Sequence, residues 1–537
     1  MPDEPSLERA ESGDGHSVYY AGRQFYSPDT PIATAKERAR RQQLPANSLV
    51  LVDSPLLGYG LDELLARISG RSWIIAVERD QKLMALTLSH ITPQLLHDQR
   101  LQLVRAETPE AVVSFLNQRG IGGVRRVVRV SLSGAGRLYP SFYREVERRV
   151  EAAIQEYWQN RATLIRLGNT WIKNLVANLS GPAIAAEAEA LDRFNAALLV
   201  GAGPSSESLY SLRSPVPANV AVFAVDTALP ILEASGLRCD AVVAVEAQWP
   251  NILDFVGLTR LPNTAFLDLT GLPSAARFLQ NCKRSFFLSR FADCRLVERL
   301  EASGVPTIPP LGSVGVIAAY LARQAGFMRV AAVGFDFAYP PGKPHARGAP
   351  THRRHLVRCG RTTPGPNYRI AAGHLHRQGK GDEVVDTDVV LSTYANLMAD
   401  LAGAFDLFLD CSKTGLPMGT INVTKLDEAL SVLSGLSVPS GASRSTPRVW
   451  SGTVRPSSPA GHIIADETLR LKRLLEALEG EDKIDAARRA LPGGDLDYLT
   501  LAYADREDLD PDNASARRRV AISARSVLDL WSRAAPD

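Results

Sequence analysis

The sequence predicts a multidomain α/β protein whose central part is a Rossmann-like, doubly wound parallel sheet. Short apolar runs typical of buried strands alternate with helical patterns between residues 191 and 425. The same alternation recurs between residues 47 and 135, which predicts a smaller α/β domain before the central one. A chain of 537 residues is also too long for one hydrophobic core, so several domains are expected.

The composition shifts along the chain predict five parts. They are a polar N-terminal arm (1–46), an N-terminal Rossmann-like α/β domain (47–135), connecting helices (136–190), the central domain (191–425) and a C-terminal helical region (426–537). A Ser/Pro-rich linker (437–461) interrupts the last part. The arm is expected to be loosely ordered, because it is polar.

The overall composition describes an ordinary soluble protein. Lys and Arg number 61 against 58 Asp and Glu, so a net charge of +3 does not indicate a nucleic-acid partner. The five cysteines are scattered without a C-x-x-C pair, which predicts neither a zinc site nor a disulfide framework and fits a reducing compartment. No apolar run reaches a membrane-spanning length, so we expect a cytoplasmic protein that does not insert into membranes.

The N-terminal α/β domain contains a weak ligand signal. An apolar run at 48–53 is followed by a glycine turn at 58–60, and Glu78 ends the next apolar run. An acidic residue about twenty positions beyond a glycine turn holds ribose hydroxyls in dinucleotide-binding folds. Because no third glycine follows, a ligand site and a purely structural turn both remain open.

The strongest candidate ligand turn is Gly201-Ala202-Gly203-Pro204-Ser205-Ser206, which follows the apolar run at 197–200. The two glycines would let a phosphate or sugar approach the backbone, and the amides of the next helix would attract negative charge. Ser206 occupies the place of the third glycine of G-x-G-x-x-G, which disfavours an ordinary NAD site. The alternative is a tight turn without a ligand.

Polar residues follow several predicted strands of the central domain, at Asp226-Thr227, Glu246-Ala247-Gln248, Asp268 and Asp336. Ligands of doubly wound sheets bind beyond the carboxyl ends of the strands, so these residues predict a shared crevice, although a single acid there is often a helix cap. Gly312 and Ser313 open an apolar helix and would offer amides and a hydroxyl to a phosphate. Ser313 is alternatively a simple N-cap.

Amphipathic helices flank the central domain. Residues 140–179 are expected to form connecting helices, in which asparagines such as Asn174 serve as caps or interhelical hydrogen-bond donors. Helical patterns at 465–478, 483–491 and 514–530 predict a small C-terminal helical domain. This domain covers the central one or contacts a partner, and Trp531 would anchor either contact.

The motifs resemble those of the bacterial CMP-sialic-acid-dependent sialyltransferases. The chain is still more similar to the motility-associated factor glycosyltransferases, also grouped with MptE-like proteins, which are associated with nonulosonic-acid modification of flagellins. The likeness covers roughly residues 45–425 and rests on the order of SPLLGYGLDELL, AVERD, NRATL, NTWIKN, GAGPSS, VDTALPIL, CDAVVAVEAQ, LGSVGVIAAYLARQAGFMRVAAVGFDF, GFDFAYPPGKPHARG and DCSKTGLPMGT. The resemblance implies inverting transfer of an acidic sugar from a CMP-activated donor to Ser or Thr of flagellin or a related surface protein. It implies no metal and no cofactor other than the CMP-sugar co-substrate, and a homo-oligomer is compatible with it.

The resemblance also implies site residues, carried over by position. The nucleotide-sugar pocket would be lined by Gly201, Gly203, Pro204, Ser205, Asp226, Thr227, Glu246, Gln248, Gly312, Ser313, Gly334 and Asp336. Ser313 would face the donor phosphate, because helix-end amides and hydroxyls stabilise a departing phosphate. Tyr339 would add a phenolic donor, or alternatively packs within its proline-rich loop.

The base that accepts the acceptor's proton is expected among five histidines after Asp336, because histidine titrates near neutral pH. The candidates rank His376, His374 and then His345; their spacing to Asp386 and Asp388 is longer than in the sialyltransferases. The sugar's carboxylate would be held by one or more of the arginines Arg347, Arg353, Arg354 and Arg358. A solvated basic loop explains these arginines equally well.

Two other functions remain open. The MptE-like group includes 6-hydroxymethylpterin pyrophosphokinases, which transfer diphosphate from ATP and need Mg²⁺ held by close carboxylates, commonly Asp-x-Asp at a strand end. This chain has Glu246-Ala247-Gln248 there, and the missing acid favours glycosyl transfer. The third possibility is a non-enzymatic flagellin-binding factor that keeps an inactive nucleotide fold.

Overall fold

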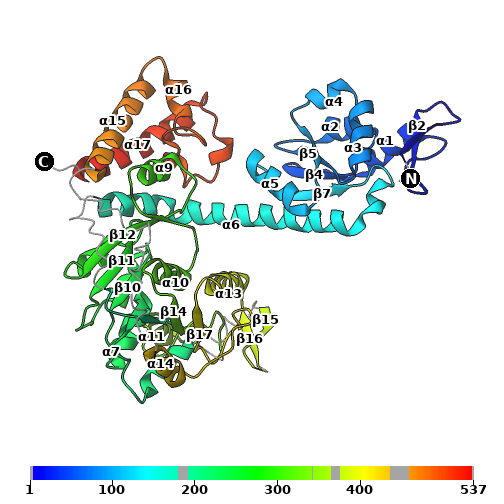
Figure 1. Cartoon of the computed structure of the whole chain (residues 1–537). Coiled ribbons are helices and arrows are strands. Elements are labelled where there is room, and N and C mark those ends of the chain that lie inside the picture. The colour runs from blue at the N-terminus through cyan, green and yellow to red at the C-terminus, as the bar shows by residue number, and fades with distance from the viewer. Residues whose placement is uncertain are drawn as a thin grey trace. The chain divides into compact units, whose positions relative to one another are not determined.

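The chain folds into two compact units in the computed structural model (Figure 1). One unit comprises Met1–Arg166 with Ala504–Leu509, and the other comprises Leu167–Tyr503 with Asp510–Asp537. The structure describes residues 4–179, 191–340, 343–363, 375–381, 383–435 and 459–534. His374 and most of the predicted linker at 437–461 lie outside these ranges.

The first unit is built on a parallel sheet with the strand order β6-β5-β4-β7. Its strands are β4 (Ser48–Asp53), β5 (Trp73–Glu78), β6 (Leu101–Arg105) and β7 (Arg126–Val130). Alternate residues of β4 face two separate apolar layers: Leu49 and Leu51 pack with α5 and α6, and Val50 and Val52 pack with α1 and α2. Burial on both faces explains why these strands are apolar throughout. The helices of this unit are α1 (Pro31–Arg41), α2 (Leu61–Arg67), α3 (Gln81–His90), α4 (Pro93–His97), α5 (Pro109–Arg119), η1 (Ala135–Leu138), the start of α6 (Pro140–Leu179) and η7 (Arg506–Asp508).

The N-terminal arm differs from the expectation of loose order. It contains an antiparallel sheet of β1 (Ser6–Arg9), β2 (His16–Tyr20) and β3 (Arg23–Gln24), followed by α1. Its few apolar side chains are buried against the loop that follows β4, where Val18, Phe25 and Tyr26 contact Leu56 and Leu57. The arm is therefore ordered by tertiary contacts that its polar composition hides.

The same contacts cover the edge of the small sheet, where the sequence allows either a ligand site or a purely structural turn. Glu78 is buried at the end of β5 and accepts a hydrogen bond from the Ser54 hydroxyl. Burial raises the pKa of Glu78 to about 7. Ser54 and Leu56 have positive φ angles of 47° and 46°, so the loop after β4 turns sharply beneath the N-terminal sheet. These contacts favour the structural interpretation of the glycine turn.

The second unit contains an eight-stranded parallel sheet with the order β13-β12-β11-β10-β9-β8-β14-β17. The strands are β8 (Ala196–Val200), β9 (Val220–Val225), β10 (Ala241–Ala244), β11 (Thr264–Asp268), β12 (Lys283–Ser289), β13 (Thr307–Ile308), β14 (Arg329–Val333) and β17 (Leu407–Asp410). This confirms the predicted doubly wound α/β class. Strand order reverses between β8 and β14, which makes their carboxyl ends the topological switch point where such sheets bind ligands.

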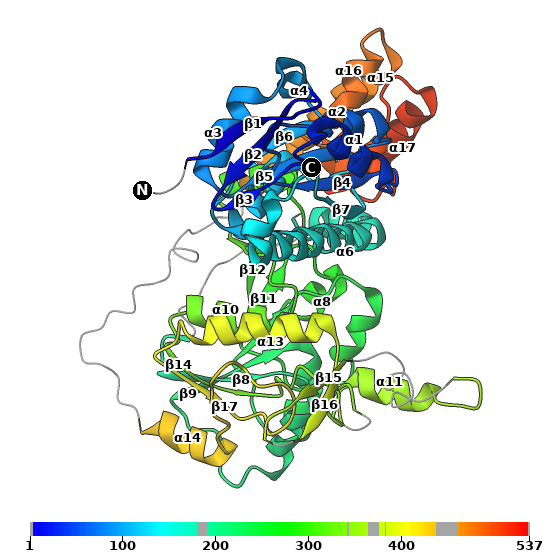
Figure 2. The ribbon, with the colours of Figure 1, turned by 90° about the vertical axis from the view of Figure 1, so that its right-hand side faces the viewer.

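Helices and a hairpin surround this sheet. α10 contacts β8, β9 and β10, and α13 packs against α10 (Figure 2). The hairpin pairs β15 (Leu375–Gln378) with β16 (Val384–Thr387). The remaining elements of this part are η3 (Pro204–Ser211), η4 (Asp226–Ala228), α7 (Leu229–Ala234), η5 (Trp249–Asp254), α8 (Pro273–Phe278), α9 (Arg295–Ala302), α10 (Val314–Gln324), α11 (Pro350–Arg358), α13 (Val389–Ala402) and α14 (Leu426–Ser434).

The predicted connecting helices form one continuous helix of 40 residues, α6. Near its end, the Asn174 side-chain amide donates to the carbonyl oxygens of Ala247 and Thr270, both at 3.0 Å. The Asn178 amide donates to those of Leu269 and Gly271, both at 2.9 Å. These asparagines therefore bind the loops after β10 and β11, whereas the sequence suggested caps or interhelical bonds.

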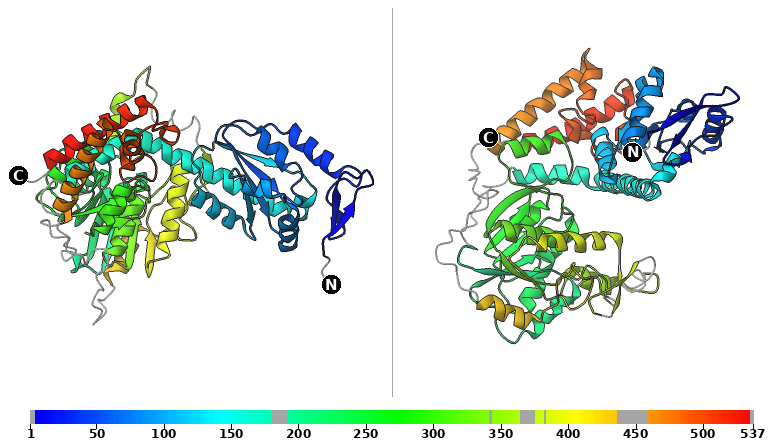
Figure 3. Two further views of the ribbon diagram at one scale, coloured as in Figure 1. Left: turned by 90° about the horizontal axis from the view of Figure 1, so that it is seen from above. Right: turned by 45° about the vertical axis from the view of Figure 1, so that its right-hand side comes forward.

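The C-terminal helices are part of the second unit. They are α15 (Pro459–Glu479), α16 (Lys483–Arg488), η6 (Asp497–Thr500) and α17 (Ala514–Ala534), and Figure 3 shows the orange and red helices packed together. The buried carboxylate of Glu467 pairs with Arg299 of α9 and accepts a hydrogen bond from Tyr498 at 3.1 Å. Trp531 is fully buried, so it stabilises this packing and is not exposed to a partner. No helix within the described ranges is long and apolar enough to cross a membrane.

Asn178→Ala should destabilise the second unit. The change leaves two buried carbonyl groups without their donor, which costs about 1–3 kcal/mol for a buried unsatisfied group. We expect a lower midpoint of thermal unfolding for Asn178→Ala than for Gln155→Ala, an exposed position on the same helix. Equal midpoints for the two variants would show that the hydrogen bonds of Asn178 do not contribute to the thermal stability of the second unit.

Candidate functional site

The loops after β8 and β14 meet at the switch point. The amide of Gly201 donates to Val333 O at 2.8 Å, and that of Gly203 donates to Gly334 O at 2.9 Å. A Cβ on Gly201 would lie 2.4 Å from Gly334 O, and one on Gly334 would lie 2.4 Å from Gly201 O. The glycines are therefore required for the close approach of the two loops to each other, in addition to any role toward a ligand.

Asp336 joins these two loops to the loop after β17. Its buried carboxylate accepts hydrogen bonds from the Ser205 amide at 3.0 Å, the Ser205 hydroxyl and the Thr414 hydroxyl at 2.7 Å. Its carbonyl oxygen accepts from the Leu416 amide at 2.8 Å. Burial raises the pKa of Asp336. The structure thus brings the predicted residues Ser205 and Asp336 together, but they bind each other.

The turn that opens α10 lies against the same loops through the buried ring of Phe335. A Cβ on Gly315 would lie 2.8 Å from this ring, and one on Gly201 would lie 3.5 Å from it. Ser313 occupies the N-cap position, but its side chain makes no capping hydrogen bond. The first amides of α10 therefore lack the side-chain acceptor that a simple N-cap would supply. Gly312 is exposed in this turn and its carbonyl accepts a hydrogen bond from Tyr394 at 2.8 Å.

Three carboxylates gather beyond β9 and β10. Asp226 follows β9, Glu246 follows β10, and Asp254 reaches the same place from the end of η5. Thr227 connects two of them: its amide donates to Asp226 at 2.9 Å and its hydroxyl donates to Asp254 at 3.2 Å. Sequence reasoning missed Asp254 because it lies inside a short 3₁₀ helix, away from any strand end.

The electrostatics of this carboxylate cluster follow from burial. Desolvation raises the pKa of Asp226 well above its ordinary value, and the neighbouring Asp254 and Glu246 raise it further. Burial also raises the pKa of Asp254 to about 6, with Glu246 adding to the shift and Thr227 and Arg354 opposing it. At least one of these carboxyl groups is therefore ready to hold a proton near neutral pH.

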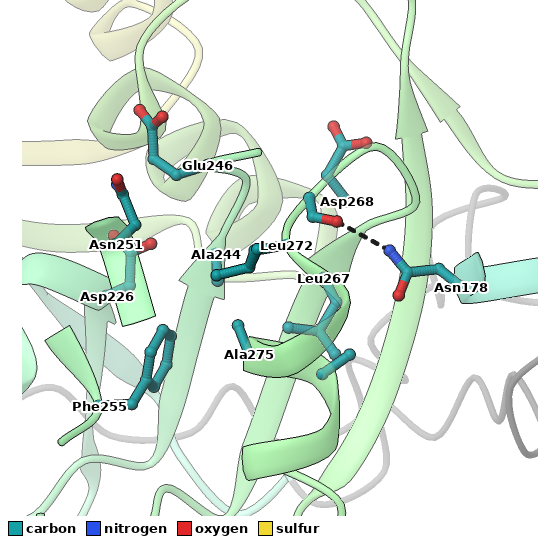
Figure 4. A pocket seen from close by; sticks show the side chains of 12 residues that line it. Asn178, Asp226, Ala244, Glu246, Asn251, Phe255, Leu267, Asp268, Leu272 and Ala275 are labelled. Carbon is teal, nitrogen blue, oxygen red and sulfur yellow. Dashed lines mark hydrogen bonds between the residues drawn. The ribbon is translucent and has the colours of Figure 1, made fainter. Parts of the chain in front are cut away.

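A small hollow lies beside the cluster (Figure 4). Figure 4 shows Asp226, Glu246 and Asn251 on one side of it and Asn178 on the other. Asp268 also lines the hollow, but its buried carboxylate is held by the hydroxyls of Thr270 and Ser289. Asp336 is not among the lining residues, so the predicted crevice of four acids is divided between two places. Gln248 is exposed at the start of η5.

Tyr339 and His376 lie at the β15–β16 hairpin. The Tyr339 hydroxyl donates to Asp388 at 2.9 Å, and burial together with Asp388 raises the pKa of Tyr339 to about 12. Nδ1 of His376 lies 2.7 Å from Asp386 on the paired strand, and its side chain is 71% exposed. A carboxylate that orients one ring nitrogen leaves the other nitrogen to accept a proton, as a general base requires.

His345 occupies a different environment. Its loop is held on η3, because Ala346 donates to Ala202 O at 2.9 Å and Lys343 pairs with Glu207 at 3.0 Å. Burial, with His355 and His352 nearby, lowers the pKa of His345 to about 4. His345 is therefore neutral at pH 7 and a weaker base than an ordinary histidine. The sequence showed these histidines clustered along the chain, and the structure places His352 and His355 near His345.

Asp254→Asn should change stability in a pH-dependent way. An Asp in the unfolded chain has a pKa near 3.9. With a folded pKa of about 6, the stabilising contribution of the protonated form is fully present below about pH 4 and is lost as the pH rises through 6. Asparagine cannot ionise and does not lose this contribution. As the pH rises from 4.5 to 7, the free energy of unfolding of Asp254→Asn should therefore increase by on the order of 2 kcal/mol relative to that of the parent.

Unfolding by urea at several pH values measures this difference. Asp293→Asn, which removes an exposed carboxylate elsewhere in the same unit, serves as the control. A difference for Asp254→Asn that does not vary with pH would disprove the buried, proton-binding carboxyl.

Comparisons with known proteins agree with this architecture. Residues 169–342 match the family model described as "6-hydroxymethylpterin diphosphokinase MptE-like". An uncharacterized protein of Treponema pallidum (strain Nichols) is 29% identical over 365 residues, which are 65% of this chain and 63% of the relative. The chain thus spans less than two thirds of the relative's length.

The fold of the whole chain also has a solved counterpart. The structure of a motility-associated factor (MAf) glycosyltransferase from Magnetospirillum magneticum AMB-1 superposes with a TM-score of 0.59 and 13% identity, covering 99% of this chain and 92% of that one. This likeness shows a shared fold. Together with the family-model match, it confirms the resemblance to the motility-associated factor and MptE-like proteins that the sequence motifs indicated.

Proposed function

We propose that the chain is an inverting glycosyltransferase, because residues 169–342 match the MptE-like family model and the chain shares the fold of a MAf glycosyltransferase. Its donor is a CMP-activated nonulosonic, sialic-acid-like sugar, and its acceptor is Ser or Thr of flagellin or a related surface protein. The observation that carries this proposal is that Tyr394 connects the start of α10 with the carboxylate cluster. Its hydroxyl donates to Gly312 O at 2.8 Å, and burial together with the nearby Glu246 raises the pKa of Tyr394. Cytoplasmic action, without a further cofactor, is part of the same proposal.

The carboxylate cluster and the start of α10 suit different parts of the CMP-sugar donor. Carboxylates repel a phosphate but accept hydrogen bonds from ribose hydroxyls and from the cytosine amino group. Asp226, Thr227 and Asp254 therefore suit the nucleoside. The phosphate suits the start of α10, where Ser313 and the first amides of the helix offer donors and a positive dipole end.

The proposed reaction replaces one C–O bond by another. The bond between the anomeric carbon and the phosphate oxygen breaks, and CMP leaves with the bonding electrons. The acceptor hydroxyl oxygen forms the new bond from the opposite face, and its proton passes to His376, which Asp386 orients. Charge on the departing phosphate is stabilised by hydroxyl and amide donors at α10.

Among the four candidate arginines, Arg354 suits the sugar's carboxylate best. It lies close enough to Asp254 to oppose the rise in that residue's pKa, so its charge reaches the carboxylate cluster. Arg347 instead lies over the Tyr210 ring at 5.4 Å, and Arg353 and Arg358 are exposed. A half-buried guanidinium at the site can bind a carboxylate with two hydrogen bonds.

Arg354→Gln should weaken binding of the CMP-activated acidic sugar by about 10- to 100-fold, the worth of a charged hydrogen bond. Affinity for CMP alone should stay unchanged, because CMP lacks the carboxylate. Arg353→Gln, the adjacent exposed arginine, should leave both affinities unchanged. Titration calorimetry with the two ligands measures this, and an equal loss of affinity for CMP and for the CMP-sugar would argue against this role of Arg354.

His376→Ala should lower the turnover number by about 100- to 10,000-fold while the affinity for CMP stays the same. Asp386→Asn should lower turnover less, because it keeps a hydrogen-bonding group beside the imidazole. His90→Ala changes an exposed histidine of the other unit and is the control. Single-turnover transfer measures each rate, and undiminished turnover in His376→Ala would remove it from the mechanism.

The proposed function itself is tested by CMP release. The protein is incubated with a CMP-activated nonulosonic acid, with and without flagellin from the same organism, and the mass of the flagellin is measured. We expect CMP release that depends on flagellin and a mass increase of one sugar per modified hydroxyl. Absence of both, with an intact protein, contradicts glycosyl transfer.

Diphosphate transfer remains the second candidate, because the matching family model carries that name. Asp254 supplies a third carboxylate beside Asp226 and Glu246, which the sequence did not reveal. Across the described residues, however, no group of three or more His, Cys, Asp or Glu side chains is placed to hold a metal ion. Consumption of ATP with 6-hydroxymethylpterin and Mg²⁺ would support this candidate, and flagellin binding without any turnover would support the non-enzymatic factor.

A further inference from the structure

Large apolar side chains are exposed on two segments at the site. On η5 and the residues after it, Trp249 is 66% exposed, Leu253 41% and Val256 61%. On α11, Leu356 is 55% exposed and Val357 79%. Several large apolar side chains exposed close together in the chain, a tryptophan among them, are typical of segments that bind another protein.

Both segments belong to the proposed active site by their other residues. η5 contributes Asp254 to the carboxylate cluster and Asn251 to the hollow. α11 carries Arg354, whose charge acts on Asp254, and buries His352. The loop before α11 packs on α7, where a Cβ on Gly348 would lie 3.6 Å from Ile231, and Glu233 of α7 accepts a hydrogen bond at 2.8 Å from the Thr259 amide in the chain after η5. The exposed faces of η5 and α11 therefore border the proposed donor site.

The charge of the α11 region is strongly one-sided. Residues 337–381 contain nine Lys or Arg and five His but no Asp or Glu, in a chain whose net charge is only +3. The donor's negative charge is met by Arg354 and the start of α10, both at the site. Arg353 and Arg358 are exposed on α11 and make no ion pair with any residue that the structure describes. Their charge is available to an acidic partner.

We propose that the exposed faces of η5 and α11 form the docking surface for the protein acceptor. The surface consists of Trp249, Leu253, Val256, Arg353, Leu356 and Val357. Its partner is an acidic polypeptide segment with apolar side chains that carries the accepting hydroxyl, because the surface is apolar and cationic. This inference rests on the proposed function and specifies how the acceptor is recognised.

The test uses the full chain and direct binding of flagellin from the same organism, measured by titration calorimetry. Arg353→Glu with Val357→Glu changes the α11 face, and Trp249→Ala changes the η5 face. Lys425→Glu with Val432→Glu on α14 is the matched control, because it introduces the same charges at exposed positions away from the site. None of these variants changes a residue assigned to donor binding or to the reaction.

We expect both surface changes to weaken flagellin binding by about ten-fold or more, while the α14 control and the affinity of every variant for CMP stay unchanged. Equal flagellin affinity in all variants, or no flagellin binding by the parent, overturns the docking surface. Binding of the parent to phosphatidylglycerol vesicles that the α11 change abolishes, with flagellin binding intact, assigns the face to a membrane and also overturns it. Flagellin binding that depends on this face without CMP release leaves the docking surface standing and refutes the transferase.

Discussion

The buried carboxylate of Asp336 is the interaction on which the second unit's ligand edge depends. It receives hydrogen bonds from the loops after β8 and β17 while it follows β14 itself, so three strand ends are fixed by one side chain. A buried carboxylate is stable only when its oxygens are well paired, and this requirement keeps the loops in one arrangement. The close approach of Gly201 and Gly334 and the packing of Phe335 against α10 occur in the same loops. The chemistry proposed for the edge thus relies on a residue that need not touch a ligand.

Charge is divided along that edge. Acidic side chains gather beyond β9 and β10, whereas residues 337–381, which run from the loop after β14 into the β15–β16 turn, contain no Asp or Glu. A nucleotide sugar has matching parts: a neutral nucleoside rich in donors, a phosphate and an acidic sugar. Arg354 lies where the two regions meet, and α11 presents its remaining basic and apolar side chains to solvent. Donor and acceptor recognition would therefore share one short helix.

The two units show that similar parallel sheets can end in differently covered edges. In the first unit, the N-terminal strands cover the loop after β4, and Glu78 is bound by Ser54. In the second unit, the corresponding edge keeps a polar hollow and a helix start without a side-chain cap. The difference arises from what packs over the edge and not from the strands beneath it.

The sequence by itself determined most strands of the two parallel sheets and the class of fold, because buried parallel strands must be apolar and their spacing by helices is local information. It did not reveal the short edge strands β13 and β17 or the antiparallel strands β1–β3, β15 and β16. It also determined the order of motifs that places this chain beside the motility-associated factor proteins. Only the tertiary structure decided the roles of individual side chains. Ser205 and Asp336 pair across 131 residues, Asp254 joins Asp226 from a short 3₁₀ helix, and the polar arm folds by contact with Leu56. Such pairings depend on three-dimensional proximity between segments distant in the chain, and neither periodicity nor spacing in one sequence encodes it.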